Sequence, residues 1–183
     1  SGLRPNAVII VATVRALKYN GGVPKAELNN ENLEALEKGI PNLLKHVENI
    51  TKVFKLPAVV ALNKFPTDTE AEIKLVEDKC KELGVNVKLS EVWAKGGEGG
   101  TEVAKEVLRL IDEGKSNFEF AYDLKLPIKE KIKTIARRIY GADDVDFTNQ
   151  ASKEISEFEK NGFGELPICM AKTQYSLTDD QTK

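Results

Sequence analysis

The residues with the most distinctive chemistry lie in the stretch SEVWAKGGEGG, at positions 90–100. Trp93 is the only tryptophan of the chain, and glycines follow it at 96, 97, 99 and 100. Glycine permits positive φ values and lets backbone amides approach a ligand, and the following helix has a dipole that favours anions. The stretch therefore predicts a seat for a flat heterocycle with an acidic or phosphorylated attachment. The residues leave a second interpretation open, in which the ring packs beneath the loops.

A second candidate stretch, NKFPTD at 63–68, combines an amide, a cation, an aromatic ring and a carboxylate. It is similar to the Asn-Lys-x-Asp motif of proteins that read nucleotide bases, but Asp68 stands two residues late. The candidate nucleotide or anion contacts of the two stretches are Asn63, Lys64, Asp68, Gly96, Gly97 and Gly99. Neither stretch matches G-x-x-x-x-G-K-[ST] or G-x-G-x-x-G, so the sequence predicts neither a triphosphate cradle nor a dinucleotide fingerprint.

Four short apolar runs with helices between them predict an α/β fold, with a mostly parallel sheet flanked by helices. Runs without polar alternation are typical of parallel strands covered on both faces. Pro41 fits the first turn of one helix, and Thr69 with Glu72 predicts a capping box on another. The predicted strands are 7–13, 57–63, 85–90 and 165–171, and the predicted helices are 30–40, 41–54, 67–84, 101–114, 127–141 and 151–162. We expect an α/β domain over 1–114 and a helical continuation with the final strand over 115–183.

The carboxyl ends of the predicted strands indicate where a ligand would bind. In an open parallel sheet, ligands bind beyond these ends, where the loops converge and the next helices direct their amide-rich N-termini. An aromatic side chain follows each strand: Tyr19, Phe65, Trp93 and Tyr175. Several rings at one edge of a sheet could contact a ligand or could pack beneath the loops, and the sequence favours the two interpretations about equally.

Composition excludes several classes of function. The 183 residues carry 27 Lys and Arg against 29 Asp and Glu, so no basic surface for nucleic acid is expected. The apolar run at 7–14 is too short to span a membrane, and no leader precedes it, which predicts a cytoplasmic protein. His46, the only histidine, has no second histidine to join it, so a zinc site or a histidine dyad is disfavoured.

Five blocks of the chain together resemble one enzyme family, formate–tetrahydrofolate ligase. They are VIIVATVRALKYNGG, VVALNKFPTDTEAEI, SEVWAKGGEGG, DLKLPIKEKIKTIARRIYGADDVDF and GFGELPICMAKTQYSL. The resemblance covers essentially the whole chain, although KYNGG departs from the Met-His-Gly-Gly of many members. It implies an enzyme that makes 10-formyltetrahydrofolate from formate, ATP and tetrahydrofolate through formyl phosphate.

The resemblance also implies which residues bind the folate. Phe65 and Trp93 match the two rings that sandwich the pterin, and Leu89 matches a residue that lines the same slot. The small-molecule substrates would be tetrahydrofolate, formate and ATP with Mg²⁺, and the parent enzyme would be a homo-oligomer.

No segment matches the family's phosphate-binding loop or the arginine that holds formyl phosphate. We therefore expect the chain to be the carboxyl-side part of the enzyme, a piece of a larger P-loop-type nucleotide hydrolase-like fold, and to be inactive by itself. The alternative that remains is a non-catalytic α/β module whose exposed rings bind a protein partner.

Overall fold

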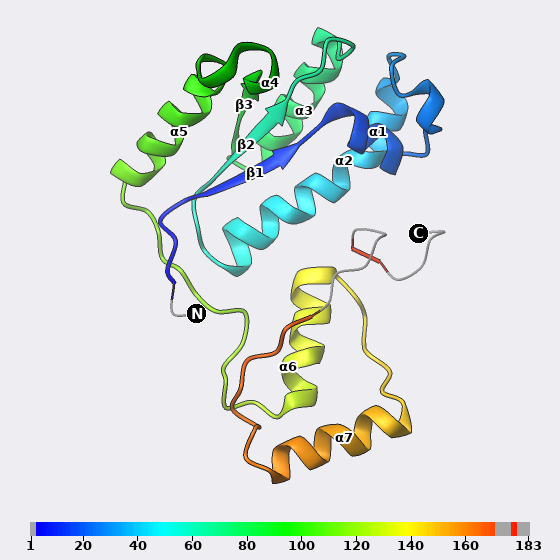
Figure 1. The fold of residues 1–183 in the computed structure, drawn as a ribbon, viewed down its shortest axis with the longest axis vertical. Coiled ribbons are helices and arrows are strands. Elements are labelled where there is room, and N and C mark those ends of the chain that lie inside the picture. The colour runs from blue at the N-terminus through cyan, green and yellow to red at the C-terminus, as the bar shows by residue number, and fades with distance from the viewer. Residues whose placement is uncertain (1–2, 171–176, 179–183) are drawn as a thin grey trace. The chain divides into compact units, whose positions relative to one another are not determined.

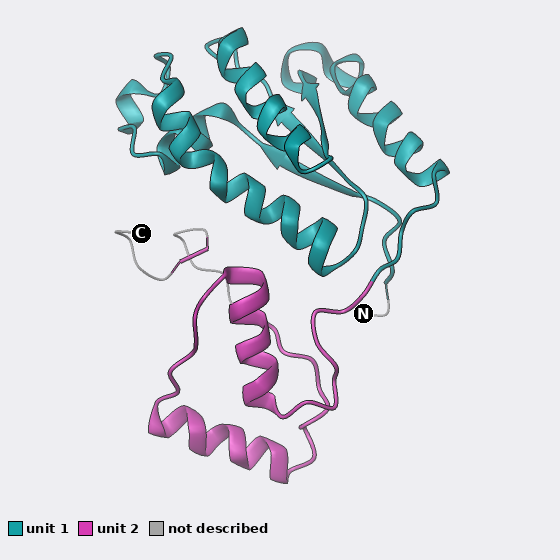
Figure 2. Ribbon diagram, turned by 180° about the vertical axis from the view of Figure 1, so that it is seen from behind, with its two compact units in different colours: residues 1–118 teal, residues 119–183 magenta. Residues whose placement is uncertain are grey.

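The computed structural model describes residues 3–170, 177 and 178, which belong to two compact units (Figure 1). The first unit is residues 1–118 and the second is residues 119–183 (Figure 2). The sequence-based division into domains at residue 114 stays a prediction.

A three-stranded parallel sheet forms the centre of the first unit. Its strands are β1 (Val8–Ala12), β2 (Ala58–Asn63) and β3 (Asn86–Ser90), in the order β1-β2-β3. The register pairs Ala12 with Leu62 and Leu62 with Leu89, so the three carboxyl ends lie at one edge. This confirms the prediction that the runs at 7–13, 57–63 and 85–90 form one parallel sheet.

Alternation along the central strand β2 divides the core into two layers. Ala58, Val60 and Leu62 lie in one apolar cluster with residues of α1, α2 and α3. Val59 and Ala61 point to the opposite face, where α5 packs against β2 and β3. The α-helices of this unit are α1 (Val14–Asn20), α2 (Leu33–Glu48), α3 (Glu70–Glu82), α4 (Val92–Lys95) and α5 (Thr101–Asp112).

Pro41 lies inside α2 and not in the first turn of a new helix, which corrects the sequence-based prediction. A proline in a helix interior leaves the carbonyl four residues earlier without its usual donor. Here both Pro41 and that residue, Glu37, lie on the exposed side of α2. The flanking Ile40 and Leu43 are buried in the core, and their burial holds the helix continuous.

The uncovered face of β1 carries apolar side chains. Ile9 is 49% exposed and Val11 is 70% exposed, although both alternate with residues that pack on the core. Large side chains on a strand are normally covered, so Ile9 and Val11 make this face an exposed apolar surface.

The second unit contains α6 (Ile128–Ile135), followed by a π-helical turn over Ala136–Tyr140, and α7 (Asn149–Lys160). The strand predicted at 165–171 is wrong for residues 165–170, which form no strand, and residue 171 lies outside the described residues. Backbone groups of residues 164–168 form hydrogen bonds with side chains and not with a neighbouring strand. The buried Lys131 ammonium donates to the carbonyls of Gly164 and Leu166, and the Tyr122 hydroxyl accepts the Ile168 N–H at 2.8 Å.

Candidate functional site

Two loops are joined at the carboxyl edge of the sheet. The Lys64 N–H donates to the Ser90 carbonyl at 3.0 Å, which continues the pairing of β2 with β3 one residue beyond Asn63. The loop after β2 therefore leaves the sheet beside the loop after β3. This backbone contact brings the stretches 63–68 and 90–100 together, although they are distant in sequence.

Trp93 connects these loops a second time. Its indole Nε1–H donates to the Lys64 carbonyl at 3.0 Å, next to Phe65 in the chain. The ring belongs to the four-residue helix α4 and is 60% exposed. It is thus not packed beneath the loops, and its polar atom is satisfied while its apolar surface meets solvent. An exposed ring fixed by its edge is suited to stacking with a flat ligand.

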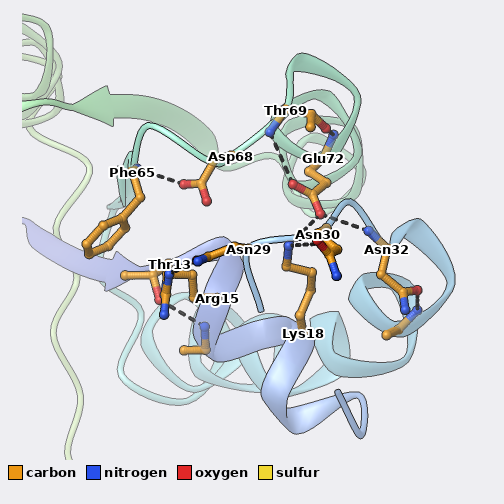
Figure 3. A network of polar contacts seen from close by, with 12 residues as sticks. Thr13, Arg15, Lys18, Asn29, Asn30, Asn32, Phe65, Asp68, Thr69 and Glu72 are labelled. Carbon is orange, nitrogen blue, oxygen red and sulfur yellow. Dashed lines mark hydrogen bonds and ion pairs between the residues drawn. The ribbon is translucent and has the colours of Figure 1, made fainter. Parts of the chain in front are cut away.

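Phe65 is half-buried and is held in a polar surrounding (Figure 3). The Arg15 guanidinium carbon lies 5.7 Å from the centre of the Phe65 ring, within the range of a cation–π contact. Arg15 also donates a hydrogen bond to the Asn29 side chain. The Phe65 N–H donates to the Asp68 carboxylate at 2.8 Å.

Leu89 lies in β3 opposite Leu62 and is half-buried. It lines a groove of about 380 Å³ along the edge of β3, together with Glu91, Lys95 and Gly99. Phe65 and Trp93 are not among the residues that line this groove. The groove gives Leu89 an open apolar surface near the carboxyl edge of the sheet.

The glycine cluster uses its small residues differently from the sequence-based expectation. Only Gly96, of the four, has a positive φ, of 59°. Gly99 is required by close approach: a Cβ there would lie 2.5 Å from the carbonyl carbon and oxygen of Glu91. The Glu91 N–H donates to the Gly99 carbonyl at 3.0 Å, so this contact closes the loop that carries Trp93.

The Gly99→Ala substitution is expected to distort the Trp93 loop and to lower the free energy of unfolding by about 1–3 kcal/mol, the usual cost of overpacking. Gly97→Ala is the matched control, because a Cβ at Gly97 has no atom within 4 Å. Thermal unfolding of the two variants measures the difference. Equal stabilities would show that the close approach at Gly99 is readily relaxed.

The other predicted contacts take separate positions. Asn63 ends β2 opposite Ser90, and the Lys64 ammonium lies 3.3 Å from the Glu70 carboxylate. Asp68 is buried, whereas Gly96 and Gly97 are exposed. Two more aromatic residues follow predicted strands. Tyr19 is exposed and lies beside Lys25, and Tyr175 falls outside the described residues.

A buried ion pair beneath the site was missed by the sequence analysis. Lys18 and Glu72 are completely buried and lie 2.8 Å apart (Figure 3). Burial by itself would raise the pKa of Glu72, but the Lys18 ammonium and the N–H groups of Thr69 and Asn32 lower it below its usual value. The predicted capping box is confirmed. Glu72 therefore both caps the start of α3 and forms the ion pair with Lys18. The one sign of a buried lysine in the sequence was the position of Lys18 directly after the core residue Leu17.

One comparison with known proteins decides the family. A family model described as formate–tetrahydrofolate ligase matches residues 1–183, the whole of the chain.

The chain belongs to the formate–tetrahydrofolate ligase family.

Members of this family are ligases of folate one-carbon metabolism. Formate–tetrahydrofolate ligases use tetrahydrofolate, formate and ATP. In the described ranges 3–170 and 177–178, no helix is long and apolar enough to cross a membrane. Within the same ranges, no group of three His, Cys, Asp or Glu side chains could hold a metal ion.

Proposed function

We propose that this chain provides the folate-binding side of a formate–tetrahydrofolate ligase. The pterin would lie between the rings of Phe65 and Trp93, and Leu89 would form an apolar wall. The observation that carries this proposal is the hydrogen bond from the Trp93 indole to the Lys64 carbonyl, because it places an exposed ring next to the loop that holds Phe65.

Stacking supplies a physical reason for two rings at this edge. A pterin between two aromatic side chains removes apolar surface from water and gains about 0.5–1.5 kcal/mol per face from ring geometry. Both rings are held before a ligand arrives, Trp93 by its indole N–H and Phe65 by its backbone N–H. Since less freedom is lost on binding to a preorganised slot, affinity rises.

The proposed chemistry has two steps. A formate oxygen attacks the terminal phosphorus of ATP, and the bond from that phosphorus to the bridging oxygen breaks. The products are formyl phosphate and ADP. An amine of tetrahydrofolate then attacks the carbonyl carbon of formyl phosphate, releasing phosphate and losing its proton. Both steps develop charge on phosphoryl oxygens, which requires cationic groups and exclusion of water. The role of this chain is to orient the amine, and no catalytic residue is assigned to it.

Nucleotide or anion contacts are proposed at the same edge. Asn63 ends the central strand and Lys64 follows it, while Gly96, Gly97 and Gly99 precede α5 with amides that an anion can approach. For Asp68, burial favours an indirect role. We also propose that the complete enzyme is a cytoplasmic homo-oligomer.

Residues 1–183 by themselves are expected to form no 10-formyltetrahydrofolate from formate, ATP and tetrahydrofolate. The sequence contains no G-x-x-x-x-G-K-[ST] motif to hold the nucleotide phosphates. The measurement is product formation by the purified 183-residue chain, with the full-length protein as the positive control. Turnover above background by the 183 residues would overturn this expectation.

A protein-interaction module is the competing function, and the exposed Ile9 and Val11 on β1 favour it. That function predicts no affinity for small heterocycles. Titration of the full-length protein with tetrahydrofolate separates the two, because only the folate site gives saturable binding that depends on Phe65 and Trp93.

A further inference from the structure

The Phe65–Asp68 turn is closed by two hydrogen bonds between the same two residues. The Phe65 N–H donates to Asp68 Oδ2 at 2.8 Å, and the Asp68 N–H donates to the Phe65 carbonyl at 3.0 Å (Figure 3). The second bond is that of an ordinary turn. The first uses a side chain that is only 7% exposed, so water competes little for it.

The Asp68 carboxyl is poorly placed to stabilise the fold. Its second oxygen, Oδ1, is buried and has no hydrogen-bond partner among the residues that the structure describes. Burial raises the pKa of Asp68, and so does the charge of Glu72, while the Phe65 N–H and the cations of Lys18 and Arg15 oppose that rise. A carboxylate with one buried, unpaired oxygen costs stability, because the lost hydration is not replaced.

The start of helix α3 does not require Asp68. Thr69 is the N-cap residue, and its hydroxyl accepts the Glu72 N–H while the Glu72 carboxylate accepts the Thr69 N–H. This reciprocal cap is complete without the preceding carboxylate. Among the described residues, the hydrogen bonds of Asp68 go to Phe65, and they fix the backbone from which the ring projects.

We infer that Asp68 is a positioning residue for folate, whose buried carboxylate holds the backbone of Phe65 so that its ring is already in place as one wall of the pterin slot. Arg15 contacts the ring itself, and Trp93 holds the preceding residue through the Lys64 carbonyl. Asp68 thus acts through Phe65 and touches no substrate. This inference rests on the proposed folate site.

The test compares Asp68→Ala with Asp68→Asn in the full-length protein. Alanine leaves the Phe65 N–H without its acceptor, whereas the asparagine amide oxygen can still accept it. We expect Asp68→Ala to raise the KM for tetrahydrofolate about tenfold through lost preorganisation. The KM for ATP and kcat should stay close to their wild-type values. Asp68→Asn should restore the KM for tetrahydrofolate to within about threefold of wild type, since the acceptor is kept.

A core variant separates positioning from general loss of stability. Val76→Ala removes methyl groups from a completely buried residue of α3 and is expected to destabilise the fold without changing the KM for tetrahydrofolate. A similar rise in KM for Val76→Ala and Asp68→Ala would overturn the inference. So would an unchanged KM in Asp68→Ala.

Amide hydrogen exchange at Phe65 tests the same hydrogen bond without folate. We expect slow exchange in the wild-type protein and in Asp68→Asn, and faster exchange in Asp68→Ala if that variant folds. Fast exchange at Phe65 in the wild type would overturn the inference even if Asp68→Ala failed to fold. Absence of folate binding by the wild type, with Phe65 still protected, would instead overturn the proposed function.

Discussion

The Lys18→Met substitution is expected to lower the free energy of unfolding by about 3–5 kcal/mol, the range for breaking one partner of a buried ion pair. Lys18 and Glu72 are both completely buried, and the Lys18 ammonium also donates to the Asn30 carbonyl at 2.8 Å. Methionine fills similar space but leaves the Glu72 carboxylate buried without its cation. Denaturant unfolding measures the loss.

Lys74→Met is the matched control, since Lys74 forms an exposed ion pair with Asp78 on the same helix, α3. Exposed pairs contribute little, so a much smaller change is expected there. Adding Glu72→Gln to Lys18→Met should recover part of the loss, because glutamine carries no charge to bury and its single amide oxygen can still accept either the Thr69 or the Asn32 N–H. Equal losses at Lys18 and Lys74 would contradict the importance of the buried pair.

The direction of the Glu72 pKa gives this prediction a pH dependence. Because the folded state lowers the pKa of Glu72, the stability from the ion pair is present above the usual pKa of glutamate, about 4.3. It is lost as the pH falls through the lower pKa of the folded state. In Lys18→Met, the buried Glu72 can avoid its charge by protonation. The difference in stability between wild type and Lys18→Met should therefore shrink toward acid pH.

The parallel sheet could be predicted because its signals are local. Unbroken apolar runs identified β1, β2 and β3, and the spacing of Thr69 and Glu72 identified the capping box. The run at 165–170 has similar apolar content but no strand partner. Lys131 donates to the carbonyls of Gly164 and Leu166 there, and a lysine 33 positions from Gly164 gives no sign of that contact in the sequence. Leu166 is 57% exposed and Ile168 is only half-buried, so apolar character by itself indicated neither strand pairing nor burial in this run.

The position of the site followed from topology, but the contacts that fix it did not. Phe65 and Trp93 lie in loops that follow two parallel strands, and such loops leave the sheet at the same edge. The indole bond to Lys64 joins residues 29 positions apart, and the Lys18–Glu72 pair joins residues 54 positions apart. Such contacts depend on the packing of whole helices. A single sequence therefore predicts the edge at which a ligand is expected, while the structure shows which contacts hold that edge together.

Trp93→Ala is expected to weaken tetrahydrofolate binding by about 1–3 kcal/mol, the loss found when a base no longer stacks on an aromatic side chain. The 60% exposure of the ring predicts only a small loss of stability, because little of its surface is buried in the core. The affinity for ATP should change much less, since stacking on the pterin does not involve the nucleotide. Titration of the full-length protein with each ligand measures these effects separately.

Trp93→Phe distinguishes stacking from the indole hydrogen bond. Phenylalanine keeps an aromatic face but cannot donate to the Lys64 carbonyl. We expect tetrahydrofolate affinity between those of wild type and Trp93→Ala, because stacking is retained on a ring that is no longer fixed. Tetrahydrofolate should quench a component of the fluorescence that is missing in both variants, which assigns that signal to Trp93. If Trp93→Ala bound folate normally but lost several kcal/mol of stability, as buried aromatic truncations do, Trp93 would be a packing residue and the slot would lie elsewhere.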